Sequence, residues 1–399
     1  MQFPFYICEL TTEEKDIFKN NFVEKNGRFY FEGIWFRNQR PENKKASGYI
    51  DETTQKRRYV QFYDAYEVQQ KEYKNYLVIK DTFVYVSNTF QKEEIIEYKQ
   101  KVLNALTQAK FTKISENSYI KNNLQVELKE YDIHPKNIES SVVFPNNYCS
   151  LDIIVHTKGY DCKIENDRMW TLSTKMFRQI EPRGEPTYIN SIEDIEKYLP
   201  AQIEMGCGPA IEVGIPPLYL MHESYKVQNH DTGKFYFGKE DDLIVNIILN
   251  TKKMYEKFSS VPKVIIKSKP TKAYDIFAKL YKKGLFTGTV LNNNFDRIVR
   301  RYGIDEKILR IYDKGTYLPQ IYFDEKAKSV ICIGIHADRR QVQKQARVAG
   351  KKVIFIDPEG FFNPNGFEPY PLEAPRTGDY IYKKTFKSAM EEFAQKYLK

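Results

Sequence analysis

Apolar and polar positions follow a regular order in the second half of the chain. From residue 202 onward, short apolar runs alternate with segments whose apolar residues recur at helical spacing. This alternation is typical of a parallel sheet with helices on both faces, because each crossover helix covers the strands that it connects. We therefore predict an α/β fold there, with strands at 201–205, 285–291, 329–333 and 353–357 and helices at 271–283 and about 339–349.

The first part of the chain follows a different pattern, with many tyrosines and phenylalanines in segments that favour strands. A chain of 399 residues exceeds what one core usually holds. We predict a mixed α+β domain at 1–185 and a Rossmann-like domain at 186–399, with the boundary between Gly184 and Ser191. In the first domain we predict strands at 59–63, 82–86, 125–131 and 150–156, a helix at 91–110 and a loop at 40–56.

Composition is that of an ordinary globular protein, with 41% hydrophobic and 29% charged residues. No apolar run approaches the roughly 20 residues that cross a bilayer, so we expect no membrane partner. The first residues lack the pattern of a secretory signal, which predicts a cytoplasmic location. Five scattered cysteines without a Cys-x-x-Cys pair indicate reduced thiols, and the five histidines show no metal-ligand spacing, so no metal site is predicted.

The net charge of +9 permits an anionic partner without selecting one. The densest basic group, at 339–352, has helical spacing and is best explained as a solvated helix face. Aromatic residues and lysines interleave at 59–76 and could stack on single-stranded nucleic acid. Since the same residues fill half-buried sheets, we favour packing and keep nucleic-acid binding as the alternative.

A glycine-spaced turn at 206–209, Gly206-Cys207-Gly208-Pro209, follows the predicted strand at 201–205. The two glycines allow a sharp turn and a close approach to phosphate, with exposed N–H groups facing the anion. Glycines at this spacing also occur in turns that bind nothing. Residues 191–194 resemble a capping box that opens a short helix before the strand, and a strand, a glycine turn and a helix start in that order favour a dinucleotide site.

Polar residues also stand where the later strands end. Residues 292–296, Asn-Asn-Asn-Phe-Asp, follow one strand, and their amide and carboxylate groups could bind ribose hydroxyls or simply form a polar turn. Gly334 and His336 follow the next strand, although a lone histidine there is more often structural. Asp357 ends the last one, where an acidic residue commonly holds an adenosine ribose or caps the next turn.

Six short motifs in this order resemble the sirtuin family, the NAD-dependent deacylases and their NAD-cleaving relatives. The resemblance extends from residue 206 to 357 and implies a parallel sheet of the sirtuin type with NAD or an ADP-ribose-type nucleotide as its ligand. Residues 206–210 resemble the family's Gly-Ala-Gly-Ile-Ser, and residues 214–219 resemble its Gly-Ile-Pro-Asp-Phe-Arg. Residues 270–274 resemble its Pro-x-x-Ala-His, and residues 292–296 resemble its Thr-Gln-Asn-Ile-Asp. Residues 334–336 and 356–357 resemble its Gly-Thr-Ser and its Ile-Asn, respectively.

The resemblance assigns Asn294 and Asp296 to the pocket around the nicotinamide and its ribose, and the glycine turn to the pyrophosphate. Asp357 would hold the adenosine ribose, and its charge would repel a 2′-phosphate, so NAD is preferred over its phosphorylated form. The cofactor-binding residues implied are Gly206, Cys207, Gly208, Pro209, Ile215, Pro216, Asn294, Asp296, Gly334 and Asp357.

The chain departs from the family where the chemistry is done. The family's general base, a histidine, should fall near residues 309–313, and no histidine is there. Tyr312, Asp313 and His336 are the candidate substitutes, although an unperturbed tyrosine, with a pKa of about 10, is a poor base near neutrality. The zinc-binding cysteine pairs are absent and residues 217–219 are Pro-Leu-Tyr, so protein deacylation is the activity least expected.

We therefore predict a sirtuin-like NAD-binding protein that cleaves NAD or transfers ADP-ribose, with Asn294, Asp296, Tyr312, Asp313 and His336 as candidate catalytic residues. Cleavage needs only positioned polar groups that stabilise the charge developing on the ribose, with water or another nucleophile as acceptor. One alternative is an inactive sensor of NAD or ADP-ribose that signals to a protein partner through residues 1–185. A second is an interaction or nucleic-acid-binding protein.

Overall fold

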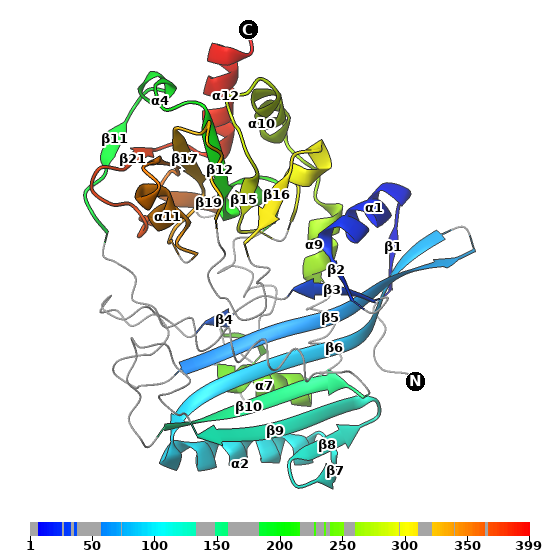
Figure 1. Cartoon of the computed structure of the whole chain (residues 1–399). Coiled ribbons are helices and arrows are strands. Elements are labelled where there is room, and N and C mark those ends of the chain that lie inside the picture. The colour runs from blue at the N-terminus through cyan, green and yellow to red at the C-terminus, as the bar shows by residue number, and fades with distance from the viewer. Residues whose placement is uncertain are drawn as a thin grey trace. The chain divides into compact units, whose positions relative to one another are not determined.

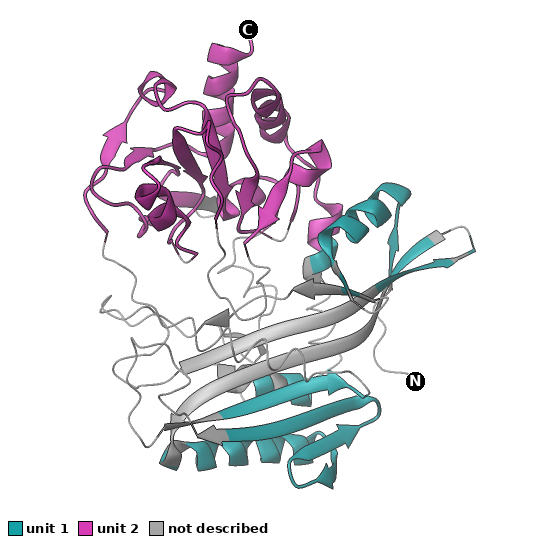
Figure 2. Ribbon diagram, viewed as in Figure 1, with its two compact units in different colours: residues 1–179, 219–263 teal, residues 180–218, 264–399 magenta. Residues whose placement is uncertain are grey.

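The computed structural model describes residues 7–25, 28–32, 36–37, 57–72, 74–132, 148–158, 183–215, 227–228, 235–236, 240–250, 260–294, 296–309, 321–338, 340–363 and 366–399. The chain divides into two compact units (Figure 2). Unit 1 comprises residues 1–179 and 219–263, and unit 2 comprises residues 180–218 and 264–399. Residues 219–263, which the sequence-based division places in the second domain, thus belong to unit 1.

Unit 1 is built on an antiparallel sheet in the order β2-β3-β5-β6-β10-β9-β8-β7, with β1 paired to β6 and β4 paired to β5 (Figure 1). Thr11 opens α1 through a capping box, in which its hydroxyl accepts from the Glu14 N–H at 3.1 Å. The strands are β1 (Ile7–Leu10), β2 (Val23–Lys25), β3 (Arg28–Glu32), β4 (Phe36–Arg37), β5 (Arg57–Lys71), β6 (Lys74–Gln91), β7 (Thr112–Ser115), β8 (Ser118–Lys121), β9 (Leu124–Asp132) and β10 (Tyr148–Thr157), and the helices are α1 (Thr12–Asn21) and α2 (Lys92–Gln108).

The inserted segment of unit 1 adds β13 (Val227–Gln228), β14 (Phe235–Tyr236) and α7 (Glu240–Leu249), and α7 packs against α2. The helix α9 (Ser260–Lys267) spans the division between the two units. The strands predicted at 59–63, 82–86, 125–131 and 150–156 and the helix predicted at 91–110 are confirmed. The loop predicted at 40–56 lies outside the described residues.

Unit 2 contains the predicted Rossmann-like parallel sheet, in the order β11-β21-β18-β17-β12-β15-β16. Every pairing in this sheet is parallel. Its strands are β11 (Thr187–Ile189), β12 (Ala201–Met205), β15 (Val290–Asn292), β16 (Glu306–Ile308), β17 (Ser329–Ile333), β18 (Lys352–Ile356) and β21 (Tyr380–Tyr382). The remaining elements are α4 (Glu193–Glu196), α5 (Cys207–Glu212), α10 (Lys272–Lys282), η2 (Val299–Tyr302), α11 (Val342–Val348), the hairpin of β19 (Gly360–Asn363) and β20 (Gly366–Pro369), and α12 (Phe386–Tyr397).

The strand order reverses beside β12. Counted along the chain from β12, the six strands β12, β15, β16, β17, β18 and β21 stand in the order 3-2-1-4-5-6, which is that of the dinucleotide-binding fold. The chain first extends the sheet on one side of β12 and then crosses back to add β17 on the other side. The switch point therefore lies between the adjacent strands β12 and β17.

Helices cover both faces of this sheet. Met205 contacts the hydroxyl of Tyr274 in α10, whereas its neighbour Glu204 accepts a hydrogen bond from Gln343 in α11. Because consecutive strand residues point to opposite faces, α10 and α11 lie on opposite sides of β12. On the α10 side, Tyr274 packs edge-on against Phe386 of α12 at 5.1 Å between ring centroids.

The prediction at 191–194 is confirmed in part. The Ser191 N–H points to the Asp194 carboxylate at 3.4 Å, as in a capping box, but the Ser191 hydroxyl accepts from Glu193 rather than from Asp194. The helix that follows, α4, is a single turn. The predicted strand at 285–291 is shorter than expected, because only residues 290–292 pair as β15, while Phe286 forms an isolated bridge with Ala201.

Candidate functional site

Two glycine-containing turns meet at the switch point. Gly206 follows β12 and Gly334 follows β17, so both stand at the carboxyl edge of the sheet. A Cβ on Gly206 would lie 2.3 Å from the Gly334 carbonyl oxygen, and one on Gly334 would lie 2.3 Å from the Gly208 nitrogen. Gly334 also has φ +64°, a conformation that side chains disfavour. The three glycines are therefore required for the two turns to pack together.

This packing changes one expectation about the glycine turn. The sequence predicts that the N–H groups of this turn are exposed toward an anion. The Gly206 N–H instead donates to the Ile333 carbonyl at 2.8 Å and so continues the backbone hydrogen bonding between β12 and β17. The neighbouring Cys207 thiol lies 3.8 Å from the Gly334 carbonyl oxygen, and Pro209 is buried in α5. The Gly206 N–H is therefore not available to an anion.

The motif Gly-Ile-Pro follows this turn. Ile215 is buried, and its N–H donates to the Ala210 carbonyl at 3.0 Å, which closes the end of α5. Pro216 lies outside the described residues, as do Tyr312 and Asp313. The proposed roles of these three residues therefore remain predictions from the sequence.

The asparagines after β15 lie beside the glycine turn. The Asn293 N–H donates to the Met205 carbonyl at 2.8 Å, and the Asn294 side-chain amide donates to the Gly206 carbonyl. The Asn292 side chain accepts from the Asn294 N–H at 2.8 Å. The two motifs therefore lie side by side at the carboxyl ends of β12 and β15.

Asp296 brings a buried carboxyl group to this edge. The residue is 1% exposed, and its Oδ1 accepts from the Ile298 N–H at 3.0 Å. Its Oδ2 is also buried and has no hydrogen-bond partner among the described residues. Burial raises the pKa of Asp296 to about 6, and the nearby Glu306 adds to the rise. A buried oxygen without a donor is costly, so a ligand amide or hydroxyl at this position would be stabilised.

Two glutamates hold the asparagine turn from neighbouring strands. Glu204 of β12 accepts from the Asn293 amide at 2.9 Å, and Glu306 of β16 accepts from the Asn292 amide at 2.8 Å. Arg297 donates to the other oxygen of Glu306 at 2.9 Å. These two acids are not among the residues that the sequence predicts for the site. The signal for Glu204 was present, because it interrupts an apolar strand directly before the glycine turn.

His336 follows Gly334 and contacts the loop before β21. Its Nε2 lies 3.4 Å from a carboxylate oxygen of Glu373, and its ring stacks on Tyr370 with 3.9 Å between centroids. The His336 carbonyl accepts from the Glu373 and Ala374 N–H groups at 2.8 and 3.1 Å. Glu373 and Tyr370 were not selected from the sequence, since only the fold brings them to β17.

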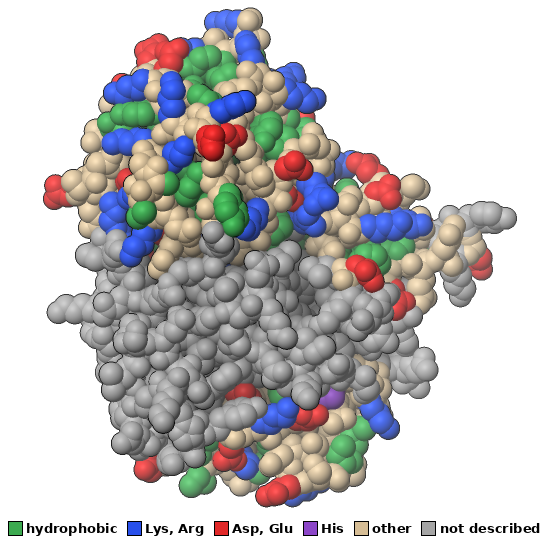
Figure 3. Space-filling model, viewed as in Figure 1, with side chains coloured by type: hydrophobic (Ala, Val, Ile, Leu, Met, Phe, Trp, Pro, Cys, Tyr) green, Lys and Arg blue, Asp and Glu red, His purple; other side chains and the backbone are tan. Residues whose placement is uncertain are grey.

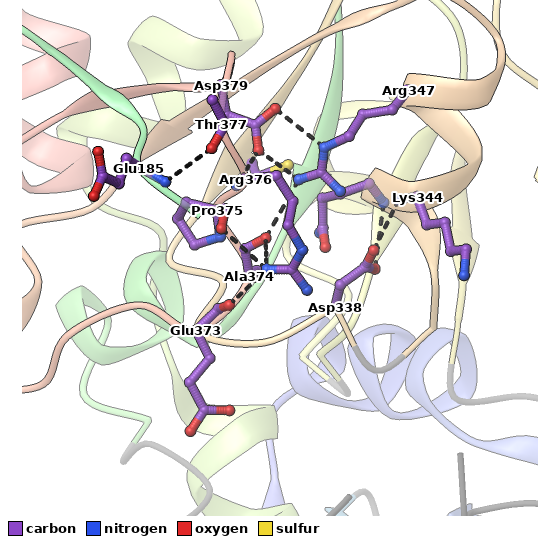
Figure 4. Close-up of polar contacts among 12 residues, drawn as sticks. Glu185, Asp338, Lys344, Arg347, Glu373, Ala374, Pro375, Arg376, Thr377 and Asp379 are labelled. Atoms are coloured by element: carbon purple, nitrogen blue, oxygen red, sulfur yellow. Dashed lines mark hydrogen bonds and ion pairs between the residues drawn. The ribbon is translucent and has the colours of Figure 1, made fainter. Parts of the chain in front are cut away.

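Two arginines fix this loop in place (Figure 4). Arg376 donates to the carbonyl oxygens of Glu373, Ala374 and Pro375 at 2.9 to 3.0 Å. Arg347 of α11 pairs with Asp379 at 2.5 Å, and the Asp379 carboxylate also accepts from the Arg376 N–H. The loop that carries Glu373 is therefore held by Arg376 through contacts within the loop, and by Arg347 through contacts with α11.

Asp357 stands after β18, as predicted. Its carboxylate accepts from the Glu359 N–H at 2.7 Å, so it caps the turn that follows, which was one of its two expected roles. Burial raises the pKa of Asp357 to about 7. Its role toward an adenosine ribose remains a prediction.

The described surface of unit 2 mixes charges of both signs. Figure 3 shows Lys and Arg side chains interspersed with Asp and Glu over the visible face. The described part of this view therefore shows no continuous basic face of the kind that favours binding to nucleic acid. In the described ranges, no helix has the length and apolarity to span a membrane, and no cluster of three or more His, Cys, Asp or Glu could hold a metal ion.

Comparisons with known proteins give a distant structural likeness. No family model matches the chain, and neither does any curated protein. Similar solved structures include a Sir2–p53 peptide–NAD+ complex (14% identity, 51% of this chain and 96% of that chain, TM-score 0.32). Another is Sir2Tm bound to a propionylated peptide (13% identity, 51% of this chain and 97% of that chain, TM-score 0.33). A third is a Sir2 homologue mutant in complex with ADP-ribose (14% identity, 51% of this chain and 95% of that chain, TM-score 0.33). At these values the likeness assigns no family or activity, and the α/β class rests on the strand order.

Proposed function

We propose that unit 2 binds NAD or an ADP-ribose-type nucleotide at the carboxyl edge of its parallel sheet and cleaves the bond between nicotinamide and ribose. The observation that carries this proposal is the buried Oδ2 of Asp296, which has no hydrogen-bond partner among the described residues and lies beside the switch point of a sheet in dinucleotide-binding order. Ligands of such sheets bind outside the carboxyl ends of the strands, at the switch point.

The roles proposed for the residues are those that the resemblance to sirtuins implies. Asn294 and Asp296 would contact the nicotinamide and its ribose, and the turn of Gly208 and Gly334 would lie along the pyrophosphate. Asp357 would accept from an adenosine ribose hydroxyl through its carboxylate. A carboxylate at that position favours NAD over its 2′-phosphorylated form.

Cleavage would draw on the same carboxyl group. When the bond to nicotinamide breaks, positive charge develops on the ribose, and a buried carboxylate can stabilise this charge in a site that excludes water. Water or another nucleophile would accept the ADP-ribosyl group. Tyr312, Asp313 and His336 remain the candidates for the group that takes up the proton.

Asp296→Asn tests the proposal directly. The amide keeps the shape of the side chain but removes the negative charge, so nicotinamide release from NAD should fall by about 100-fold or more. ADP-ribose affinity, measured by calorimetry, should change much less, because the ribose of bound ADP-ribose develops no positive charge for the carboxylate to stabilise. Asp305→Asn, which alters an exposed carboxylate nine positions away, is the matched control and should behave like the wild type.

Two outcomes would reject the proposal. The first is that the wild-type protein binds neither NAD nor ADP-ribose in the calorimeter. The second is that it binds one of them, but Asp296→Asn and Asp305→Asn give the same affinities and the same nicotinamide release.

A second candidate function is that of a sensor that binds the nucleotide and leaves it intact. The observation that favours it is that His336, the one histidine at this edge among the described residues, is held by Glu373 and Tyr370. A sensor should show tight NAD binding with no nicotinamide released at any protein concentration. The response would then be expected to pass to a protein partner through unit 1.

A further inference from the structure

Glu204 is the one acidic residue of β12, and it is 2% exposed. Three side-chain donors converge on its two carboxylate oxygens. The Asn293 amide reaches Oε1 at 2.9 Å, the Cys332 thiol reaches Oε2 at 3.4 Å, and the Gln343 amide also donates to Oε2. These donors belong to the turn after β15, to β17 and to α11, so one buried carboxyl group joins three elements around the switch point.

The turn that Glu204 holds is the one that leads to Asp296. Asn293 is tied to β12 twice, through its side chain to Glu204 and through its N–H to the Met205 carbonyl. The next residue, Asn294, is bonded to the Gly206 carbonyl. A change in the contact between Glu204 and Asn293 therefore alters the position of the adjacent Asn294, which belongs to the proposed nucleotide site.

The charged and titratable groups around Glu204 come from β17 and α11. Asp338, which precedes α11, places a second carboxyl group near it, and the Cys332 thiol faces it from β17. Arg347 of α11 is close enough to Asp338 and Cys332 to interact with their charges, but it is paired with Asp379. Burial first, and then Asp338, raise the pKa of Glu204 to about 8.

The donor pattern fits the ionised form of this group. Three side-chain donors reach its two oxygens, and hydrogen bonds to a charged acceptor are the stronger ones. When Glu204 gains a proton, its oxygens become weaker acceptors and the contact with Asn293 weakens. Loss of the proton therefore tightens the turn.

We propose that Glu204 is a positioning residue of the nucleotide site, which fixes the Asn293–Asn294 turn and makes ligand affinity depend on the gain or loss of one proton. This inference rests on the proposed function, because it assigns a regulation to the same site. Glu204 itself acts through Asn293 and touches no ligand.

Calorimetry with ADP-ribose between about pH 7 and pH 9 tests the inference, since this range brackets the titration of Glu204. Wild-type affinity should rise with pH. Glu204→Gln should flatten this profile and lower the affinity at the high-pH end by about tenfold, the loss expected for one hydrogen bond to a charged group. Glu204→Asp should restore part of the pH dependence, and Glu392→Gln, on α12, should leave it unchanged. Equal profiles for the wild type and Glu204→Gln would overturn the inference.

Hydrogen exchange separates this inference from the proposed function, because it needs no ligand. Backbone amides of residues 292–294 should exchange faster in Glu204→Gln than in the wild type, after correction for intrinsic rates. If the protein binds no nucleotide but the exchange changes as stated, the proposed function fails and the positioning role stands. Unchanged exchange with intact nucleotide binding would remove the positioning role alone.

Asn293→Ser covers the case in which Glu204→Gln does not fold. It shortens the other partner of the same contact and leaves the carboxyl group with its Cys332 and Gln343 donors. It should likewise weaken ADP-ribose binding at high pH and speed exchange at residues 292–294. A wild-type affinity profile in this variant would contradict the inference.

Discussion

At the scale of single residues, the glycines at the switch point are explained by contact between two backbones. Gly334 lies so close to Gly208 that neither position has room for a Cβ. The sequence shows glycines after two strands, but it cannot show that the two turns meet. A phosphate cradle and a tight packing contact therefore look alike in the sequence, and the fold shows that the packing requirement is present.

Gly334→Ala should destabilise unit 2 by about 2–4 kcal/mol, because it adds a left-handed strain and a clash with the Gly208 backbone. Gly350→Ala is the matched control, since Gly350 has φ +70° and nothing within 4 Å of its would-be Cβ. The control should lose only about 1 kcal/mol, which is the strain term. The free energies of unfolding from urea titrations followed by circular dichroism provide the comparison. Equal losses in the two variants would show that the contact between the turns contributes nothing.

At the scale of elements, α11 is fixed at its beginning by Asp338. The Asp338 carboxylate accepts from the Lys344 and Gln343 N–H groups at 2.8 and 3.3 Å, and burial raises the pKa of this group to about 6. The same helix carries Gln343 to Glu204 and Arg347 to Asp379. The Asp338 carboxylate thus holds in place the helix that contacts both Glu204 and Asp379.

Asp338→Ala should cost about 1 kcal/mol of unfolding free energy, the usual loss for a missing helix cap. Asp338→Asn keeps an acceptor and removes a negative charge near Glu204, so its stability should stay close to that of the wild type. The same variant should also shift the ADP-ribose affinity profile to lower pH, because Glu204 would then titrate beside a neutral neighbour. A loss for Asp338→Asn as large as that for Asp338→Ala would contradict the capping role.

At the scale of the whole molecule, the two units should respond differently to pH. In unit 2, burial raises the pKa of Glu212, and it raises the pKa values of four further carboxyl groups well above their ordinary range. These are Glu204 at about 8, Asp357 at about 7, and Asp296 and Asp338 at about 6. In unit 1, the hydrogen bond from buried His156 lowers the pKa of Glu127 instead.

The stability of unit 2 should therefore fall as pH rises from about 4 to about 8. In this range the carboxyl groups of the folded unit hold protons that the same groups in the unfolded chain have lost. A carboxyl group whose pKa is higher in the folded state adds to the free energy of unfolding at low pH, and this contribution is lost as the pH rises through the folded-state pKa. Glu127 acts in the opposite sense, and its contribution to unit 1 is lost as the pH falls below its ordinary pKa of 4.5. Stability of unit 2 that is constant or rising over the stated range would contradict the prediction.

Hydrogen exchange distinguishes the two units in this measurement. Exchange of β9 and β10 amides reports on unit 1. Hydrogen exchange of β12 and β17 amides reports on unit 2. Glu204→Gln and Asp296→Asn should each reduce the pH dependence measured at these strands.

The sequence by itself determined four main elements of unit 2 and two of the acidic residues that follow its strands. Apolar runs, helical spacing and polar residues at strand ends are local properties, so they located β12, α10, β17 and β18 and selected Asp296 and Asp357. Tertiary structure alone decided which of these residues meet. The strand order places β15 and β17 on the two sides of β12, which brings Asn293 and Gln343 to Glu204 and Glu373 to His336. Such contacts join residues up to 139 positions apart, and no local pattern encodes them because they depend on how the strands are ordered.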